Sequence, residues 1–370
     1  MGPTIPLEAL EPALRDLGGV PQDPVHHGEG DALVHTRLVV ERMERQPSFL
    51  ALGPEDRQLL LAAAALHDLG KARCTALEDG RWTSPGHSAA GEKMARTYLM
   101  TQLGLSGTPE AIGLREAVCR LVRWHMGPCH VFGRDDPSRY LRQMASAGEL
   151  TAPFTLEKLA VLAEADCRGR ECADRDALLE EIALFRALAE ETGCLHGPFA
   201  YPDAYSRYGD LSGRAVAAGQ RVYDPTWGTV VMVSGLPGTG KDTYIAGRYG
   251  DMPMVSLDQV RRETGAAPDD GGGAVLRAAR EQARALLREK RPFLFNATNL
   301  SPANRGRWTD LFHRYGASVR IEYLETGWEE RQRRNLSRRD SVPENAVARM
   351  LRSFSPPLLT EAEQVRWICV

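Results

Sequence analysis

The amino-acid sequence predicts a two-domain protein in which an all-helical domain precedes an α/β domain with a parallel sheet. Residues 1–195 contain apolar runs with helical period and few strand signals, as in 54–68 and 155–166. Residues 229–370 alternate short apolar strands with helical segments, which is typical of a parallel sheet covered by helices. Residues 196–228 are rich in Gly, Pro and Tyr, so we expect a connecting segment there.

The composition agrees with two globular domains and argues against a disulfide-rich, zinc-ribbon or membrane protein. The chain has 370 residues, of which 43% are hydrophobic and 26% charged, and its net charge is −3. Seven scattered cysteines without a CxxC pair predict neither a disulfide framework nor a zinc ribbon. No apolar stretch reaches ~18 residues, the length that spans a bilayer. We therefore expect a cytoplasmic protein without a membrane segment.

In the helical domain, six potential metal ligands lie at the ends of apolar helical rows, where their side chains should face the core. These candidates are His35, His67, Asp68, His87, His125 and Asp166. A single histidine on such a row is more often an ordinary core residue. Two buried carboxylates are costly unless paired or bound to metal, so the six together favour a metal centre.

Imidazole and carboxylate ligands suit Mn, Fe, Co, Ni or Zn, and six ligands suffice for two divalent transition ions. The first ion is expected on His35, His67, Asp68 and Asp166. Asp68 would bridge to a second ion that His87 and His125 hold. Two neighbouring ions can clamp a phosphoryl group and activate water, so the pattern predicts phosphoester hydrolysis.

Five segments of this domain resemble the HD phosphohydrolase superfamily, in particular the HD domains attached to tRNA nucleotidyltransferases. They are HHGEGDALVHT (26–36), ALHDLGKARCT (65–75), GHSAAGEKMA (86–95), LVRWHMGP (121–128) and LAEADCRGR (162–170). The resemblance implies activity on 2′-phosphates and 2′,3′-cyclic phosphates at RNA ends. It also implies that Lys71, as a catalytic residue, and Arg170 lie near the scissile phosphate, and that His27 reaches the site. Lys71 could instead be a solvated charge after a helix.

The α/β domain begins with a strand, a glycine-rich loop and a helix in that order. Strands are expected at 230–234, 252–256, 292–297 and 318–324, and the chain closes with a further apolar segment, 364–370. The candidate ATP-binding residues are Gly235, Leu236, Pro237, Gly238, Thr239, Gly240, Lys241, Asp242 and Thr243. Backbone N–H groups of such a loop bind phosphate oxygens, and Lys241 would reach the β/γ-phosphates. Asp242 occupies the usual Ser/Thr position, so either Asp242 or Thr243 organises Mg²⁺.

Two further features follow the loop. Asp258 and Arg261 lie one helical turn apart, so a carboxylate that can accept a proton faces the same way as a phosphate-binding arginine. Asp258 could also simply cap a helix. Five arginines between 331 and 339 could form a lid that neutralises a transferring phosphoryl group, or a solvated basic face.

These stretches resemble the P-loop domain of phage-type polynucleotide 5′-kinases. The matching pieces are GLPGTGKDT (235–243), LDQVR (257–261), NATNL (296–300) and RRNLSRRDSVP (333–343). The resemblance implies that Lys241 binds phosphates, Asp258 is the general base and Arg261 holds the phosphate next to the 5′-OH. Arg338, or Arg339 one residue later, would be the lid arginine. Asn296 stands where that family often has an Asp.

An HD domain followed by such a kinase resembles the bacterial HD-Pnk end-healing enzymes. The resemblance implies hydrolysis of 2′,3′-cyclic phosphate, 2′-phosphate or 3′-phosphate ends and transfer of the ATP γ-phosphate to a 5′-OH polynucleotide end. Its partners would be RNA or DNA ends and, functionally, a polynucleotide ligase. One alternative is a nucleoside or small-molecule kinase joined to an HD nucleotide phosphohydrolase. Another is a nucleotide-sensing regulator with inactive sites.

Overall fold

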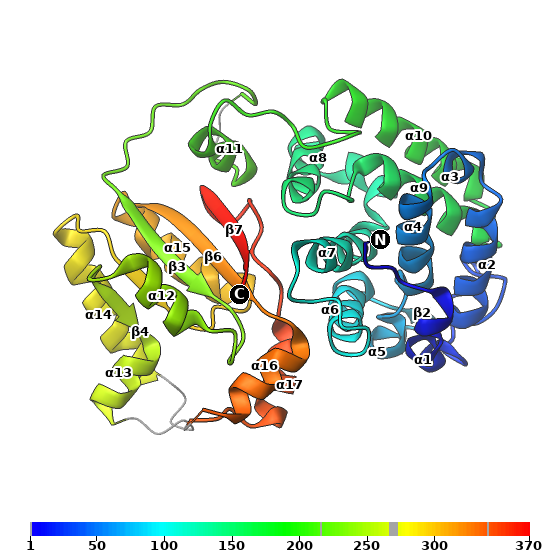
Figure 1. The fold of residues 1–370 in the computed structure, drawn as a ribbon. Coiled ribbons are helices and arrows are strands. Elements are labelled where there is room, and N and C mark those ends of the chain that lie inside the picture. Colours follow the sequence, from blue (N-terminus) through cyan, green and yellow to red (C-terminus); the bar gives the residue numbers. More distant parts are fainter. Residues whose placement is uncertain (1, 215–216, 266–272, 339) are drawn as a thin grey trace. The chain divides into compact units, whose positions relative to one another are not determined.

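The computed structural model describes residues 2–214, 217–265, 273–338 and 340–370. The chain divides into two compact units, Met1–Phe199 and Ala200–Val370 (Figure 1). Most of the segment predicted as a connection, 196–228, therefore belongs to the second unit, where it includes a short helix, α11 (Ala204–Leu211).

The first unit is helical, as the sequence predicts. Its longer helices are α2 (Ala32–Glu44), α4 (Pro54–Leu66), α6 (His87–Thr101), α7 (Pro109–Trp124), α8 (Pro137–Ala145), α9 (Leu156–Gly169) and α10 (Arg175–Glu191). Shorter turns are η1 (Leu7–Leu10), α1 (Glu11–Leu14), η2 (Arg15–Leu17), α3 (Pro47–Leu50), α5 (Lys71–Cys74), η3 (Gly127–Cys129), η4 (Val131–Gly133) and η5 (Ser146–Glu149). Helix α2 packs against α9 and α4, and α6 packs against α7.

Side-chain caps begin three of the helices that position the predicted ligands, α2, α7 and α9. Asp31 accepts hydrogen bonds from the backbone N–H groups of Leu33 and Val34, and so starts α2. Thr108 and Thr155 cap α7 and α9 in the same way. Each cap satisfies amide groups that a helix leaves unpaired at its first turn. Helix α4 buries nearly its whole circumference, as its sequence indicates.

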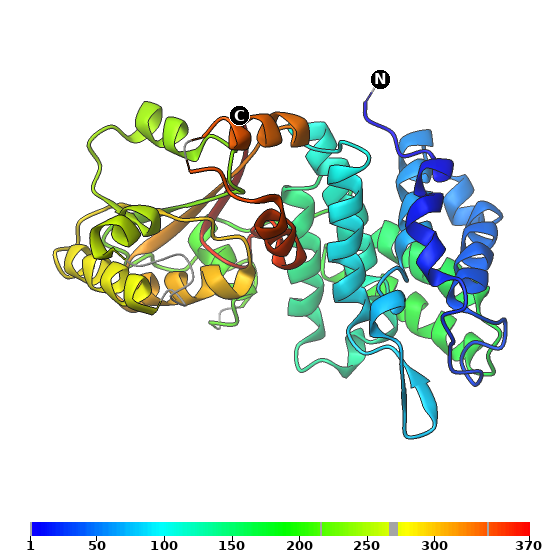
Figure 2. The ribbon, with the colours of Figure 1, turned by 90° about the horizontal axis from the view of Figure 1, so that it is seen from below.

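The first unit also contains a β-hairpin that was not predicted from the sequence. Strands β1 (Ala76–Glu78) and β2 (Arg81–Thr83) pair antiparallel, and their hairpin projects from the helices (Figure 2). The two turn residues, Asp79 and Gly80, both have positive φ angles, of 50° and 76°. Asp-Gly is a preferred pair for such a turn, so this dipeptide was the signal for the hairpin.

The second unit contains a five-stranded parallel sheet in the order β4-β5-β3-β6-β7, which confirms the predicted α/β class. The strands are β3 (Thr229–Ser234), β4 (Met254–Ser256), β5 (Leu294–Asn296), β6 (Ser318–Glu325) and β7 (Gln364–Cys369). Strand β4 is shorter than predicted and begins after Pro253, which has no N–H group to donate to a neighbouring strand.

Helices cover both faces of this sheet (Figure 1). They are α12 (Lys241–Tyr249), α13 (Leu257–Thr264), α14 (Gly273–Arg288), α15 (Pro302–Arg314), α16 (Trp328–Leu336) and α17 (Glu344–Ser353). Leu294 of β5 packs in a cluster with Ile245 of α12, whereas the ring of the next residue, Phe295, lies 4.2 Å from that of Trp308 on α15. Successive side chains of β5 thus point to opposite faces of the sheet, and helices bury both faces. The C-terminal ends of β3, β4 and β5 open onto the candidate nucleotide site.

Among the described helices, none combines the length and the apolar character that a membrane span requires.

Candidate metal centre and nucleotide site

The six predicted metal ligands come together in the first unit. They lie on α2 (His35), directly after α4 (His67 and Asp68), at the start of α6 (His87), directly after α7 (His125) and on α9 (Asp166). Five of them are buried, and the His87 side chain is 16% exposed. Residues from five separate stretches of chain therefore meet at one point in the helical core.

Asp68 lies between two pairs of histidines. One carboxylate oxygen, Oδ2, is 3.2 Å from Nε2 of His67 and 3.6 Å from Nε2 of His35. The other, Oδ1, is 3.4 Å from Nε2 of His87 and 3.9 Å from Nε2 of His125. Each group of three offers ligand atoms within 4.8 Å of one another. On the first side, Oδ1 of Asp166 lies 3.1 Å from His35 Nε2.

The histidines are held in the tautomer that binds metal through Nε2. Nδ1 of His67 lies 2.7 Å from the carbonyl oxygen of Ala64, and Nδ1 of His125 lies 2.8 Å from that of Val122. His87 makes the same contact, at 2.8 Å, with the carbonyl of Ser84. Because a carbonyl only accepts, Nδ1 carries the proton and the lone pair of Nε2 faces Asp68. This donor set fits divalent transition ions.

Two glycines let the ligand-bearing segments approach one another. A Cβ atom on Gly70 would overlap the backbone of His87, so only glycine allows the turn after Asp68 to rest on α6. A Cβ atom on Gly169 would lie 2.7 Å from a methyl carbon of Val39, so glycine also permits the close contact of α9 with α2. Steric contact at these points fixes the spacing of the ligand candidates.

Two cations accompany the carboxylates. Nζ of Lys71 is 2.7 Å from Oδ2 of Asp68, and the Arg170 guanidinium forms two hydrogen bonds to Asp166, of 3.1 and 2.7 Å. Burial tends to raise the pKa of both carboxyl groups, but these cations hold both pKa values well below their usual range. Burial lowers the pKa of His125 to about 3, so its imidazole is neutral near pH 7, as a metal ligand must be.

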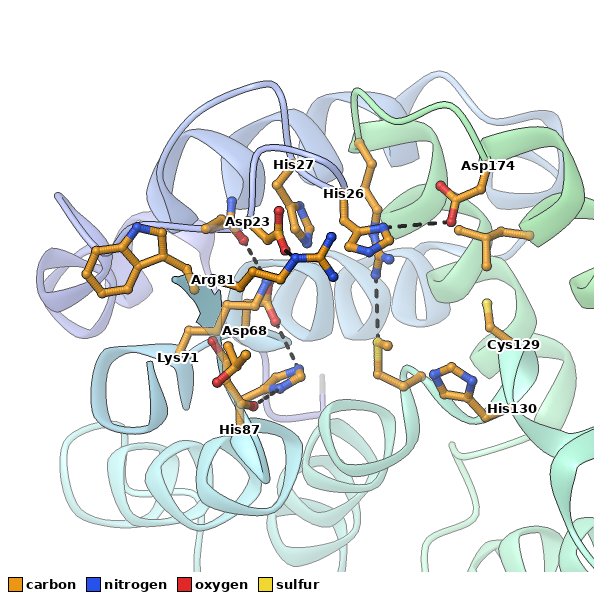
Figure 3. A pocket seen from close by; sticks show the side chains of 17 residues that line it. Asp23, His26, His27, Asp68, Lys71, Arg81, His87, Cys129, His130 and Asp174 are labelled. Carbon is orange, nitrogen blue, oxygen red and sulfur yellow. Dashed lines mark hydrogen bonds and ion pairs between the residues drawn. The ribbon is translucent and has the colours of Figure 1, made fainter. Parts of the chain in front are cut away.

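A pocket of about 460 Å³ opens onto this centre, and Asp68 and His87 form part of its wall. Lys71, Arg170 and His27, the three residues expected near the scissile phosphate, also line it. Figure 3 shows His26 and His27 on one side of the pocket and Lys71 and His87 on the other. The hairpin contributes further wall residues, including Arg81 and Trp82. Such a cavity can admit an anionic group next to the ligand candidates.

Glu29, whose side chain is almost fully buried, also belongs to the site but was not predicted from the sequence. Its Oε1 atom is 2.7 Å from Nδ1 of His35 and 2.8 Å from Nδ1 of His27, while Oε2 accepts a hydrogen bond from the N–H of Glu171. Burial would raise the pKa of Glu29, but these hydrogen bonds lower it below its usual range. Glu29 therefore orients both histidines as a carboxylate.

In the second unit, the glycine-rich loop runs from the end of β3 to the start of α12. Gly238 and Gly240 have φ angles of 89° and 84°, which favour glycine. The Lys241 ammonium donates to the carbonyl oxygens of Gly235 and Leu236, at 2.9 and 3.1 Å. Burial lowers the pKa of Lys241 to about 8. The lysine thus rests on its own loop, at the position expected for phosphates.

Helix α16 packs against this loop. A Cβ atom on Gly238 would lie 2.5 Å from the carbonyl oxygen of Arg331, and the buried Arg331 side chain stacks 4.2 Å from the Trp328 ring. Arg334 and Arg338 instead line a pocket of about 290 Å³ over the loop. The predicted arginine run is therefore divided between a packing residue and pocket residues. Arg339, the alternative lid arginine, lies outside the described residues.

Three of the remaining kinase candidates line the same pocket, and Arg261 pairs with one of them. Asp242, Thr243 and Asp258 all contribute to it. Arg261 forms a 3.0 Å ion pair with Asp258, and both side chains are exposed. Asn296, at the end of β5, donates a 3.2 Å hydrogen bond to Asp242. The amide in the NATNL segment thus reaches the carboxylate that replaces the usual hydroxyl of the loop.

Comparison with known proteins shows that the two units match different families. Residues 33–163 match the family described as the HD domain, and residues 230–357 match the family described as the AAA domain. The chain thus joins a helical HD domain to a P-loop domain with a five-stranded parallel sheet. This pairing supports a fused phosphohydrolase and kinase-like enzyme.

The chain is also similar to several proteins called multifunctional CCA protein. The protein from Actinobacillus pleuropneumoniae serotype 5b (strain L20) is 33% identical over 164 residues, which are 44% of this chain and 37% of that protein. The protein from Methylococcus capsulatus is 35% identical over 166 residues, 44% of this chain and 35% of the relative. The relative from Methylobacillus flagellatus is 28% identical over 204 residues, 54% and 45% of the two chains. The chain thus spans less than half the length of these relatives.

Proposed function

We propose that this chain heals the ends of broken nucleic-acid strands, with one activity in each unit. The helical unit would hydrolyse 2′,3′-cyclic phosphate, 2′-phosphate or 3′-phosphate ends. The P-loop unit would transfer the γ-phosphate of ATP to a 5′-OH end. This is the arrangement of the bacterial HD-Pnk enzymes that the sequence resembles.

In the helical unit, we assign one divalent ion to His35, His67, Asp68 and Asp166, and a second to Asp68, His87 and His125. Bound ions of this kind polarise phosphoryl oxygens and lower the pKa of coordinated water. Lys71 and Arg170 supply positive charge to an anionic phosphate in the pocket, and His27 contributes a further polar group to its wall.

In the P-loop unit, Asp258 accepts the proton of the 5′-hydroxyl as that oxygen attacks the γ-phosphorus of ATP and ADP leaves. Arg261, now paired with Asp258, would bind the acceptor phosphate next to the reacting nucleotide. Lys241 and Arg338 neutralise charge on the transferring group. Asp242, held by Asn296, and Thr243 are the groups available to organise the Mg²⁺ of ATP.

The observation that carries the proposal is the exposed ion pair of Asp258 and Arg261 beside the phosphate loop, in a chain that also contains the metal centre. A proton acceptor and a phosphate-binding cation side by side suit an acceptor that carries both a hydroxyl and a phosphate. Similarity to multifunctional CCA proteins, together with resemblance to the HD domains of tRNA nucleotidyltransferases, supports RNA or DNA ends as substrates. The products are the ends that a polynucleotide ligase joins.

The test uses the full chain with two labelled oligonucleotides, one with a 5′-OH and one with a 2′,3′-cyclic phosphate. Asp258→Ala should abolish 5′ phosphorylation and leave cyclic-phosphate hydrolysis intact, whereas His67→Ala should have the reverse effect. Loss of both activities in either variant would mean a shared site and contradict the proposal. Phosphorylation of free nucleosides, with none of the 5′-OH oligonucleotide, would favour the small-molecule kinase alternative.

A further inference from the structure

A second basic pocket adjoins the candidate kinase site on the face of the sheet covered by α14 and α15. Its volume is about 340 Å³, and its described lining includes three arginines, Arg277 and Arg280 on α14 and Arg307 on α15. Its other described lining residues are Leu257, Gly273, Leu276, Ala297, Thr298, Asn299, Asn304 and Trp308. None of these described residues carries a carboxylate.

The three arginines are available to a ligand. All three are exposed at the pocket, and none forms an ion pair with a carboxylate in the part of the chain that the structure describes. Arg277 and Arg280 lie three residues apart on α14 and therefore on one face of the helix. Arg284, one turn further along, pairs with Glu281 and does not line the pocket. A group of guanidinium ions without a carboxylate among the described lining residues is suited to phosphates, which arginine can bind through two parallel hydrogen bonds.

This second pocket lies beside the site at which the acceptor of the phosphoryl group is proposed to bind. Leu257 and Ala297 line it, whereas their chain neighbours Asp258 and Asn296 line the pocket over the phosphate loop. The two cavities therefore lie next to each other at the C-terminal ends of β4 and β5. The loop pocket already accounts for the phosphates of ATP, so the second pocket is free for another anion.

The lining also offers apolar surface. Leu257, Leu276 and Ala297 lie beside the arginines, and the guanidinium of Arg280 is 5.9 Å from the Trp308 ring. Positive charge next to apolar surface is the combination that binds a single strand, whose phosphates repeat and whose bases pack on flat or apolar groups.

We infer that this pocket binds the single-stranded continuation of the acceptor, beyond the nucleotide that bears the 5′-OH. Arg277, Arg280 and Arg307 contact successive backbone phosphates, while Arg261 holds the first. The inference rests on the proposed kinase function and extends it, because it makes the enzyme select polynucleotides over mononucleotides. A free nucleoside would gain nothing from these arginines.

The experiment compares two acceptors, a nucleoside 3′-phosphate and a 5′-OH oligonucleotide of about six nucleotides. For Arg277→Gln, Arg280→Gln and Arg307→Gln, we expect KM for the oligonucleotide to rise roughly 5- to 20-fold, with KM for ATP and for the nucleoside 3′-phosphate unchanged. Each substitution should also reduce the slope of log K against log salt by about 0.7 for oligonucleotide binding. The matched control is Arg284→Gln, which removes the same charge from α14 outside the pocket.

The outcomes separate this inference from the function on which it rests. If the wild-type chain phosphorylates the oligonucleotide and the three variants retain its KM, the pocket is not the strand site and the inference fails alone. An equal rise in KM for Arg284→Gln would indicate a general charge effect and also overturn it. If the wild-type chain phosphorylates nucleosides but no oligonucleotide, both the inference and the proposed kinase function fail.

Discussion

Nδ1 of His35 lies 2.7 Å from Oε1 of Glu29, and this contact directs the opposite nitrogen of the ring toward Asp166 and Asp68. Glu29 is not itself a member of the six-residue set. A carboxylate in this position fixes the tautomer and raises the basicity of the imidazole. Correct ligation at the centre thus depends on a residue in the loop before α2.

Glu29→Gln should weaken metal binding and phosphoester hydrolysis by roughly 10- to 100-fold, because the amide no longer offers His35 and His27 a charged acceptor. Metal content after dialysis and the rate of cyclic-phosphate hydrolysis measure the effect. Kinase activity should remain unchanged. Glu171→Gln is the control, because Glu171 donates to Glu29 through its backbone N–H group, which the substitution keeps. Equal losses in the two variants would argue against an orienting role.

Metal removal should separate the two activities. Treatment with a strong chelator followed by Mg²⁺ alone should restore 5′ phosphorylation but not phosphoester hydrolysis, since imidazole-rich sites prefer transition ions. Addition of Mn²⁺, Co²⁺ or Ni²⁺ should then restore hydrolysis. Full hydrolysis with Mg²⁺ alone would be inconsistent with the metal centre proposed for His35, His67 and Asp68.

The pKa of Lys241 makes ATP binding depend on pH. Burial lowers this pKa to about 8, so above that pH the free protein carries a neutral amine. Phosphates stabilise the ammonium form, so affinity for ATP should fall as the pH rises through about 8, and binding should take up a proton near pH 8.5. Calorimetry in two buffers of different ionisation enthalpy measures this uptake. Lys241→Arg should abolish it, because arginine remains charged.

A buried ion-pair network should govern the stability of the helical unit. Glu116 contacts Arg96, Arg115 and Arg120 inside the bundle, and although burial would raise its pKa, these cations lower it to about 2. Glu116→Gln removes the carboxylate that pairs with buried Arg115 and leaves Arg96 and Arg120 paired with Glu92, so it should cost about 3–5 kcal/mol. Heat should then inactivate the phosphoesterase faster while the kinase half-life stays unchanged. Similar half-lives for both activities would contradict a local effect.

The lowered pKa of Glu116 should also make the helical unit sensitive to acid. This pKa is lower in the folded state than in the unfolded state, so the stabilising contribution of the carboxylate is complete above the unfolded value of about 4.5. That contribution is lost progressively as the pH falls toward 2. The acid midpoint of unfolding, followed by circular dichroism, should therefore shift upward in any variant that removes Arg96.

Periodicity was sufficient to predict those parts of the site that lie on regular elements. His35, His125 and Asp166 extend apolar helical rows, so their burial followed from the spacing of neighbouring residues. The parallel sheet followed from apolar strands that alternate with helices. In both cases the spacing of apolar residues along the chain indicates which side of a helix or strand is buried.

Other parts depend on contacts that no local pattern encodes. Glu29 lies in an irregular loop, and its role depends on the approach of His27 and His35 in space. The second basic pocket combines α14 with α15, which lie on either side of β5 in the sequence. The Asp79–Gly80 turn, by contrast, was detectable, because that dipeptide favours a two-residue hairpin.

Asp68 faces both histidine groups through different oxygens, so the two proposed ions would share the charge of one carboxylate. The first ion would use part of that charge and would repel the second, so the two ions should bind with different affinities. Titration of the metal-free chain should accordingly give two separate loading steps. At scarce metal most molecules would hold a single ion, so hydrolysis that needs both ions would stop first while the kinase continues to work.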